Sequence, residues 1–222
     1  MKNLDLKNKN IVIFGATSFI GFKLTNLLAQ KGANLIIHGK SSEKLKDLYE
    51  QIYSNNCKII TINSDVLSEK FYLESLKTIF LKFSHIDLLI NLIGKFNGLQ
   101  SITDLSHREW NDLIEVNFSS YWRILKELSP LLGKKRKSKI IFLTNKKIAK
   151  GIAYHNSFCL TKDLLKGFVN IYNLEKEKFG IKCSLLDIKK LNVGMTSLLR
   201  GKNQFLERDL NDAIKKILNE MI

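Results

Sequence analysis

Proline is almost absent from this 222-residue sequence, in which Pro130 is the only one, and no proline- and glycine-rich stretch marks an interdomain linker. No apolar run approaches the ~20 residues that a membrane-spanning helix needs. The opening residues MKNLDLKNKN also lack the apolar segment of a signal peptide. We therefore expect a single domain over residues 1–222, a cytoplasmic location and no association with membranes.

The chain also has few cysteines, and they are Cys57, Cys159 and Cys183. Their number is odd, and no two of them have the short spacing of a metal-binding knuckle or a disulfide framework. This pattern argues against structural disulfides and against a metal site. We expect three buried thiols that serve only in packing.

Acidic residues are scarce relative to basic ones, 21 against 36, which gives a formal net charge of +15. Such an excess suggests nucleic-acid binding as one interpretation, because clustered cations gain affinity by releasing counterions from phosphates. The lysines are scattered, however, and the one dense run, KKRKSK at residues 134–139, lies between a helical and a strand pattern. We expect this run to be a solvated loop, and we predict no nucleic-acid partner.

Short β-branched runs alternate with longer amphipathic segments along most of the chain. Strands that are apolar on both faces, each followed by a helix, favour a parallel sheet covered on both sides, because parallel strands need crossover connections. The pattern therefore predicts an α/β fold with a doubly wound parallel sheet. The predicted strands are 11–14, 34–38, 58–62, 87–91, 139–144 and 182–188, and the predicted helices are 20–31, 42–54, 68–83, 107–129 and 156–178.

A glycine-rich turn, GATSFIG at residues 15–21, joins the first predicted strand to the first predicted helix. Such a turn lets the backbone approach a pyrophosphate, whose charge meets free N–H groups and the positive end of the helix dipole. A plain tight turn, with Gly21 allowing close helix packing, is the alternative interpretation. The turn by itself leaves both open.

Further motifs follow in an order that resembles the short-chain dehydrogenase/reductase family, across about residues 8–188. The turn keeps Gly15 and Gly21, whereas the family's middle glycine is replaced by Ser18 or, in the shorter family pattern, by Phe19. The motifs SDV, NLIG and DLSHREWNDLIEVNFSSYW carry the other matching positions, Asp65, Val66, Asn91, Gly94 and Asn117. The resemblance implies a Rossmann-type fold and a nicotinamide cofactor, bound by Gly15, Ser18, Ile20, Gly21, Lys40, Asp65, Val66, Asn91, Gly94 and Lys162.

The choice of cofactor depends on the end of the second predicted strand. NAD-selective members of the family have an acidic residue there, which bonds the ribose hydroxyls and would repel the extra phosphate of NADP. This sequence has Gly39 at that point and Lys40 next to it. NADP is therefore the expected cofactor, although Lys40 also fits the description of one more surface lysine.

The resemblance also assigns the catalytic positions. In the family a tyrosine acts as general acid, a lysine one turn later lowers the tyrosine's pKa and binds the cofactor ribose, a serine orients the substrate oxygen, and an asparagine holds a relay water. Lys162 and Asn117 match the lysine and the asparagine, but Phe158 stands in place of the tyrosine and Asn145 in place of the serine. Tyr154 and His155 are alternative acids if the loop before the helix rearranges.

The carboxy-terminal part departs further from the family. Asn192, Val193 and Gly194 stand near the family's Pro-Gly, and Thr196 is a candidate for its cofactor-contacting threonine. DLNDAIKKILNEMI, residues 209–222, predicts a final helix, and no residues remain for the family's seventh strand. We expect the sheet to lack that strand.

Two functions remain in competition. The first is a catalytically impaired family member that acts as a partner or scaffold subunit, and the second is a slow or atypical NADP-dependent carbonyl/hydroxyl oxidoreductase. The loss of several catalytic positions together favours the first, and the substrate is not predictable. A homodimer, or a heteromer with another family member, is expected through the helices at 107–129 and 156–178, which carry Trp110, Phe118, Trp122, Phe168 and Tyr172.

Overall fold

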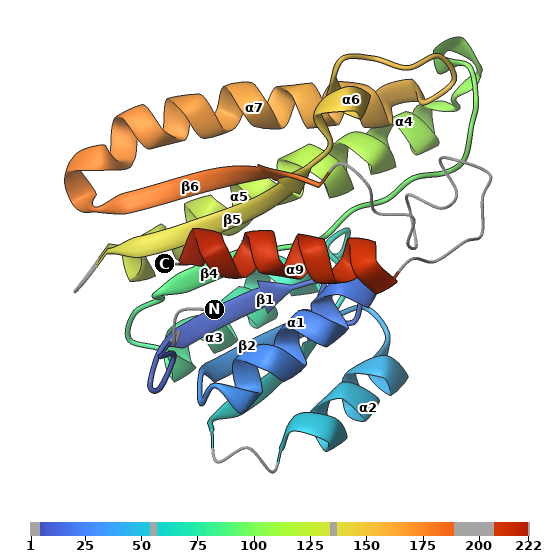
Figure 1. The fold of residues 1–222 in the computed structure, drawn as a ribbon. Coiled ribbons are helices and arrows are strands. Elements are labelled where there is room, and N and C mark those ends of the chain that lie inside the picture. The colour runs from blue at the N-terminus through green and yellow to red at the C-terminus, as the bar shows by residue number, and fades with distance from the viewer. Residues whose placement is uncertain (1–4, 54–56, 134–136, 189–206, 222) are drawn as a thin grey trace.

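The computed structural model describes residues 5–53, 57–133, 137–188 and 207–221. Its centre is a parallel sheet with strand order β3-β2-β1-β4-β5-β6, so the chain starts in the middle and winds outward in both directions (Figure 1). This order confirms the predicted doubly wound α/β fold. The six strands of the described residues are β1 (Asn10–Phe14), β2 (Asn34–Gly39), β3 (Ile59–Asn63), β4 (Leu88–Asn91), β5 (Ser138–Thr144) and β6 (Ile181–Asp187).

Helices cover both faces of the sheet, and the alternation of side chains along each strand divides the core between them. Ile11 and Ile13 of β1 pack on one side, with α1 (Phe19–Gln30), α2 (Ser42–Ile52) and α9 (Glu207–Met221). Val12 and Phe14 point to the opposite side. The helices there are α3 (Leu76–Lys82), α4 (His107–Ile114), α5 (Ser120–Leu128) and α7 (Asn156–Lys176). Figure 1 shows α1 and α9 together on one face of the sheet and α4 and α5 on the other.

Two of the predicted helices have a different form in the structure. The segment predicted as one helix over 107–129 contains a π-helical turn, η3 (Glu115–Ser119), between α4 and α5. The helix predicted from residue 68 begins at Glu69 and contains another π-helical turn, η1 (Phe71–Ser75). A short helix that the sequence pattern did not predict, α6 (Lys146–Ala149), follows β5. The predicted final helix is confirmed as α9.

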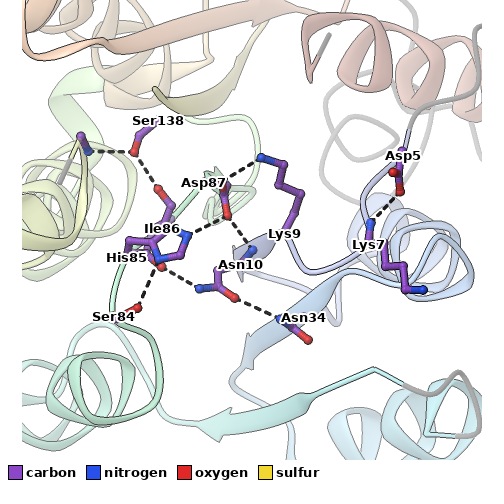
Figure 2. Close-up of polar contacts among 11 residues, drawn as sticks. Asp5, Lys7, Lys9, Asn10, Asn34, Ser84, His85, Ile86, Asp87 and Ser138 are labelled. Carbon is purple, nitrogen blue, oxygen red and sulfur yellow. Dashed lines mark hydrogen bonds and ion pairs between the residues drawn. The ribbon is translucent and has the colours of Figure 1, made fainter. Parts of the chain in front are cut away.

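A polar network joins the amino-terminal ends of the central strands (Figure 2). The Asp87 carboxylate, just before β4, accepts hydrogen bonds from the Asn10 amide N–H at 2.9 Å and from Lys9 Nζ at 3.1 Å. His85 Nε2 lies 3.3 Å from the same carboxylate. The Asn10 side chain in turn bonds the His85 carbonyl and the side chain of Asn34. These contacts fix the end of the sheet opposite to the one where the loops of the candidate site gather.

The structure also bears on the predictions for the cysteines, the basic run and the carboxy-terminal positions. Cys159 and Cys183 are buried free thiols as expected, whereas Cys57 is only partly buried, because it precedes the edge strand β3. Within the dense basic run, residues 134–136 lie outside the described residues. The same holds for Asn192, Val193, Gly194 and Thr196. Among the described helices, none is both long and apolar enough to cross a membrane.

Candidate cofactor and active site

The turn from β1 to α1 requires glycine at two positions. Gly15 has a φ of +76°, and a Cβ on it would lie 3.1 Å from the carbonyl carbon of Leu92. A Cβ on Gly21 would come within 2.4 Å of the Gly15 carbonyl oxygen. The two glycines therefore let the turn, the start of α1 and the loop after β4 approach one another closely.

Ser18 replaces the family's middle glycine and caps α1. Its backbone is extended, and its Oγ accepts a hydrogen bond of 3.1 Å from the Gly21 N–H. Serine is a favoured residue at this position because its hydroxyl satisfies one of the N–H groups left unpaired at a helix start. Ser18 thus stabilises the start of α1, and its own hydroxyl oxygen accepts the hydrogen bond of the Gly21 N–H.

The end of β2 has no room for an acidic side chain. A Cβ on Gly39 would lie 2.6 Å from Cγ2 of Thr17, so the threonine fills the place where an acid would begin. Lys40 follows with a side chain that is 77% exposed, and its Nζ lies 2.6 Å from Oδ2 of Asp65. Burial acts to raise the pKa of Asp65, but the Lys40 and Leu67 hydrogen bonds and the nearby lysine charges lower it overall. Lys40 and Asp65 therefore form an ion pair beside the predicted adenosine site.

Two further residues predicted to bind the cofactor, Val66 and Asn91, make hydrogen bonds that involve backbone groups. Val66 is buried, and its carbonyl accepts a 3.1 Å hydrogen bond from the hydroxyl of Tyr72. Asn91, at the end of β4, is fully buried and accepts a 3.0 Å bond from the Ile93 N–H. The Nδ2 of Asn91 has no hydrogen-bond partner among the described residues. A buried amide nitrogen left without a partner costs free energy.

Asn117 lies in the π-helical turn and fastens the loop after β4 to the helix. Its Oδ1 accepts from the Lys95 N–H at 2.9 Å, and its Nδ2 donates to the Lys95 and Leu113 carbonyls, both at 2.9 Å. The side chain is fully buried, and both of its N–H groups are used. Asn117 therefore positions the loop that contains Gly94.

A cavity of about 1050 Å³ opens between this loop, the glycine turn, the end of β5 and the start of α7. Its lining is mostly apolar, with a few polar side chains. Six of the predicted site residues line it: Ser18, Ile20, Gly94, Asn145, Phe158 and Lys162. The other predicted site residues do not: Gly15, Gly21, Lys40, Asp65, Val66, Asn91 and Asn117. The fold thus brings the predicted catalytic side chains of β5 and α7 to one cavity.

Phe158 and Lys162 lie one helical turn apart on α7 and face the cavity together. Phe158 is 4% exposed, and its ring packs 5.4 Å from the ring of Phe96, measured between centroids. The Nζ of Lys162 lies 5.1 Å from the centroid of the Phe158 ring. Lys162 is 8% exposed, and burial lowers its pKa to about 8. Where the family has a hydroxyl beside this amine, the chain presents the face of a phenyl ring.

Asn145 and Thr144 supply the polar groups on the β5 side. Nδ2 of Asn145 donates to the Ile188 carbonyl at 3.3 Å, and its Oδ1 accepts from the Ile148 N–H at 3.3 Å. Asn145 thereby starts α6 and ties it to the residue after β6. Thr144 lines the same cavity, and its hydroxyl is buried and has no hydrogen-bond partner among the described residues. The sequence pattern pointed to Thr144 only as a neighbour of Asn145.

Tyr154 and His155, the alternative acids, do not line the cavity. Tyr154 is 64% exposed, and its carbonyl bonds the Gln100 N–H in a loop contact. His155 is buried, and its Nδ1 lies 3.0 Å from the Ala153 carbonyl oxygen. The loop rearrangement that either acid would require is not present in this structure, and neither group is in position to replace the tyrosine hydroxyl.

Comparison with known proteins identifies the class. The sequence pattern of the family described as short chain dehydrogenase matches residues 9–203, which is most of the chain. The protein belongs to the short-chain dehydrogenase/reductase family.

Individual relatives agree with this assignment. An uncharacterized oxidoreductase of Staphylococcus epidermidis is 26% identical over 192 residues, covering 86% of this chain and 81% of the relative. The 3-oxoacyl-[acyl-carrier-protein] reductase of Salmonella typhimurium is 26% identical over 198 residues, covering 88% of this chain and 79% of that enzyme. The chain is thus related to oxidoreductases over nearly its full length.

Solved structures show the same fold at low sequence identity. A short chain dehydrogenase from Salmonella enterica serovar Typhi superimposes with a TM-score of 0.90 at 18% identity, covering 100% of this chain and 93% of the other. A short chain dehydrogenase from Escherichia coli, complexed with NADPH, superimposes with a TM-score of 0.89 at 18% identity, again covering 100% and 93%. At this identity the likeness establishes the fold alone.

Proposed function

We propose that this chain is an NADP-binding member of the family in which carbonyl reduction is impaired, and that it acts as a subunit of a dimer. The observation that carries the proposal is the contact between Lys162 and Phe158. The amine lies 5.1 Å from the centroid of a ring that has no proton to give. A general acid contributes about 10²- to 10⁴-fold to the rate of such a reaction, so its loss leaves a slow site.

The described residues fit a dinucleotide. Gly15 and Gly21 stand where a Cβ would close the turn, and the cavity beyond them has a volume of about 1050 Å³. The proposed cofactor-binding residues are Gly15, Ser18, Ile20, Gly21, Lys40, Asp65, Val66, Asn91, Gly94 and Lys162. NADPH supplies a hydride when bound. The remaining chemistry, delivery of a proton to the substrate oxygen, falls to this chain's own side chains, and Phe158 and Asn145 are poorly suited to it.

The preference for NADP rests on the end of β2. Thr17 fills the space beside Gly39, so no acid opposes a ribose phosphate there. Lys40 lies at the same edge, and its pairing with Asp65 positions an exposed ammonium group. A family structure that contains NADPH has the same fold, which supports a cofactor of this type.

A titration with NADPH and NADH, followed by cofactor fluorescence or calorimetry, tests this proposal. We expect NADPH to bind at least about tenfold more tightly than NADH, since removing one good charge contact changes affinity by roughly 1.4 kcal/mol or more. Lys40→Ala should reduce the preference, whereas Lys77→Ala, which removes an exposed charge on α3, should leave it unchanged. Equal or tighter binding of NADH would overturn the preference. No binding of either cofactor at millimolar concentration would leave only the scaffold role.

The subunit role rests on the outer face of α7. Its exposed apolar residues follow one another at spacings of four, three, four and three, and they are Leu160, Leu164, Gly167, Ile171 and Leu174. A Cβ on Gly167 would meet no atom within 4 Å, so the middle of this row is open for a close approach by another helix. Tyr172, by contrast, is buried, and Phe118 and Phe168 pack against the core. Of the residues predicted for the interface, Trp110 and Trp122 are exposed, and the row on α7 adds further exposed apolar side chains to the proposed interface.

A slow oxidoreductase is the second candidate, and one observation favours it. Lys162 keeps its family position in the cavity, and Thr144, whose buried hydroxyl has no partner among the described residues, is part of the same lining. These two groups offer a weak hydrogen-bonding site for a carbonyl oxygen without the tyrosine. Steady turnover that is lost in both Lys162→Met and Thr144→Val would favour this candidate over the scaffold role.

A further inference from the structure

The buried amine of Lys162 has an unusual environment for a lysine. It is 8% exposed, and the described residues provide it with neither a hydrogen bond nor an ion pair, only the face of the Phe158 ring. The acidic residues that line the same cavity, Asp47 and Glu50, are on α2 and form no ion pair with it. A buried ammonium without an anionic partner is unstable, so the neutral amine is favoured.

A neutral lysine amine in an apolar cavity is a nucleophile. Burial lowers the pKa of Lys162 to about 8, so about half of the amine is unprotonated at pH 8. An ordinary lysine with a pKa of about 10.4 is less than about 1% unprotonated at the same pH. Lysines activated by desolvation in this way are known to form Schiff bases with carbonyl compounds. The replacement of a tyrosine by Phe158 also leaves the Lys162 amine without a hydrogen-bond partner that a tyrosine hydroxyl could provide.

The cavity also has the size and polarity for a small carbonyl compound. Its lining is largely aliphatic and aromatic, and includes Ile93, Leu143 and Ile148 together with Phe158. Thr144 is part of the same lining, and its hydroxyl is buried and has no partner among the described residues. A rotation of the Thr144 side chain is needed before this hydroxyl can donate a hydrogen bond to a carbonyl oxygen in the cavity. The apolar part of this lining favours apolar aldehydes, and the charged side chains of Asp47 and Glu50 lie on the α2 side of the cavity.

We propose that Lys162 captures apolar aldehydes by forming an imine, with the Thr144 hydroxyl holding the carbonyl oxygen. The nitrogen lone pair attacks the carbonyl carbon and forms a C–N bond, and the oxygen becomes the hydroxyl of a carbinolamine. The C–O bond then breaks, and the oxygen leaves as water with the two hydrogens of the original amine. No electrons are exchanged with an oxidant or a reductant, and no cofactor is needed. The proposed function assigns the same lysine to the cofactor, so trapping is proposed for the protein without cofactor, and a failure of NADPH binding would not affect it.

Reductive trapping tests the proposal on the full chain. The protein is incubated at pH 8 with hexanal, the imine is reduced by added cyanoborohydride, and the alkylated lysines are measured by peptide mass spectrometry. Lys166, four residues further along α7 and exposed, serves as the internal control. We expect the initial rate of trapping at Lys162 to exceed that at Lys166 by about tenfold or more, since the gain in free amine is only partly offset by its lower basicity.

Matched variants make the test specific. Lys162→Arg should abolish the adduct at this position and leave the Lys166 adduct unchanged. Phe158→Tyr should reduce trapping at Lys162 severalfold because it gives the amine a hydroxyl partner. Thr144→Val should also slow trapping. A Lys162 adduct that forms no faster than the Lys166 adduct, or that is unaffected by Phe158→Tyr, would overturn the proposal.

Discussion

A single missing oxygen atom changes the chemistry around Lys162. Phe158 keeps an aromatic ring packed against Ile148 and Phe96, so the start of α7 retains its core contacts. The amine above the ring gains a cation–π contact of about 0.5–2 kcal/mol, which offsets only part of its desolvation. Phe158 therefore removes the general acid and leaves the desolvation of Lys162 only partly offset.

His38, at the end of β2, provides a prediction on pH dependence. Burial lowers its pKa to about 4, although the hydrogen bond to the Ser64 carbonyl and the charge of Asp65 act in the opposite direction. Because the folded-state pKa lies below the unfolded value of about 6.5, the unfolded state binds the proton more readily between these values. The stability that His38 contributes is complete above about pH 6.5 and is lost as the pH falls toward 4. The loss should reach about 2–3 kcal/mol.

Urea unfolding of the wild type and His38→Gln at several pH values between 4 and 7 measures this contribution. The wild type should lose more stability than the variant over this interval, and His107→Gln, which alters an exposed histidine, should behave as the wild type. Equal pH slopes for the wild type and His38→Gln would contradict the prediction, as would a His38 ring that titrates near pH 6.5 by NMR.

The site residues differ in how far the sequence could reveal them. Phe158 and Asn145 could be identified because their positions are fixed by spacing along one chain segment. The pairing of Lys40 with Asp65 could not, since it depends on how β2 and β3 lie side by side in the sheet. The sequence also could not predict that the buried Thr144 hydroxyl has no hydrogen-bond partner among the described residues, because this depends on which groups the fold places around it.

At the level of elements, the π-helical turn between α4 and α5 determines where Asn117 lies. A π turn inserts an extra residue in the helix, and such turns often occur at functional positions. Here the turn coincides with the three hydrogen bonds that Asn117 makes to the Lys95 backbone and the Leu113 carbonyl. The helical periodicity of the sequence predicted one continuous helix, because one inserted residue barely alters the apolar pattern.

Asn117→Ala should lower the free energy of unfolding by about 2–4 kcal/mol, because it leaves buried backbone groups of the loop after β4 without partners. Urea unfolding followed by circular dichroism gives the measurement. Asn111→Ala, on the exposed side of α4, is the matched control and should change stability by about 0.5 kcal/mol or less. A loss below about 1 kcal/mol for Asn117→Ala would show that the loop does not depend on this side chain.

The strands were the most predictable elements. All six lie within a residue or so of the predicted ranges, because fully buried parallel strands are recognisable as continuous apolar runs. α6 was missed because its four residues, Lys146–Ala149, are too short for a helical period to be visible. Its start depends instead on the Asn145 side chain, which bonds the Ile148 N–H.

At the scale of the whole molecule, the proposed interface predicts that two copies of the chain associate. We expect a dimer at about 20 μM by light scattering, with the row of apolar residues on α7 at its centre. Leu164→Glu places a charge in the middle of that row and should produce monomers, since burying an unpaired carboxylate costs several kcal/mol. Leu73→Glu, at an exposed leucine in η1, should leave the dimer intact. A monomeric wild type that recovers no family partner in a pull-down would contradict the interface.

The rate of carbonyl reduction in Phe158→Tyr tests the central claim most directly. With NADPH and a panel of ordinary ketones and aldehydes, the wild type should remain near background, far below typical rates of about 1 s⁻¹ or more. Phe158→Tyr should raise the rate by about 10²-fold, within the range for a restored general acid, and adding Asn145→Ser should raise it further. Phe158→Leu, which changes the ring without adding a hydroxyl, should remain at background. Turnover by the wild type at about 1 s⁻¹ or faster would contradict the account.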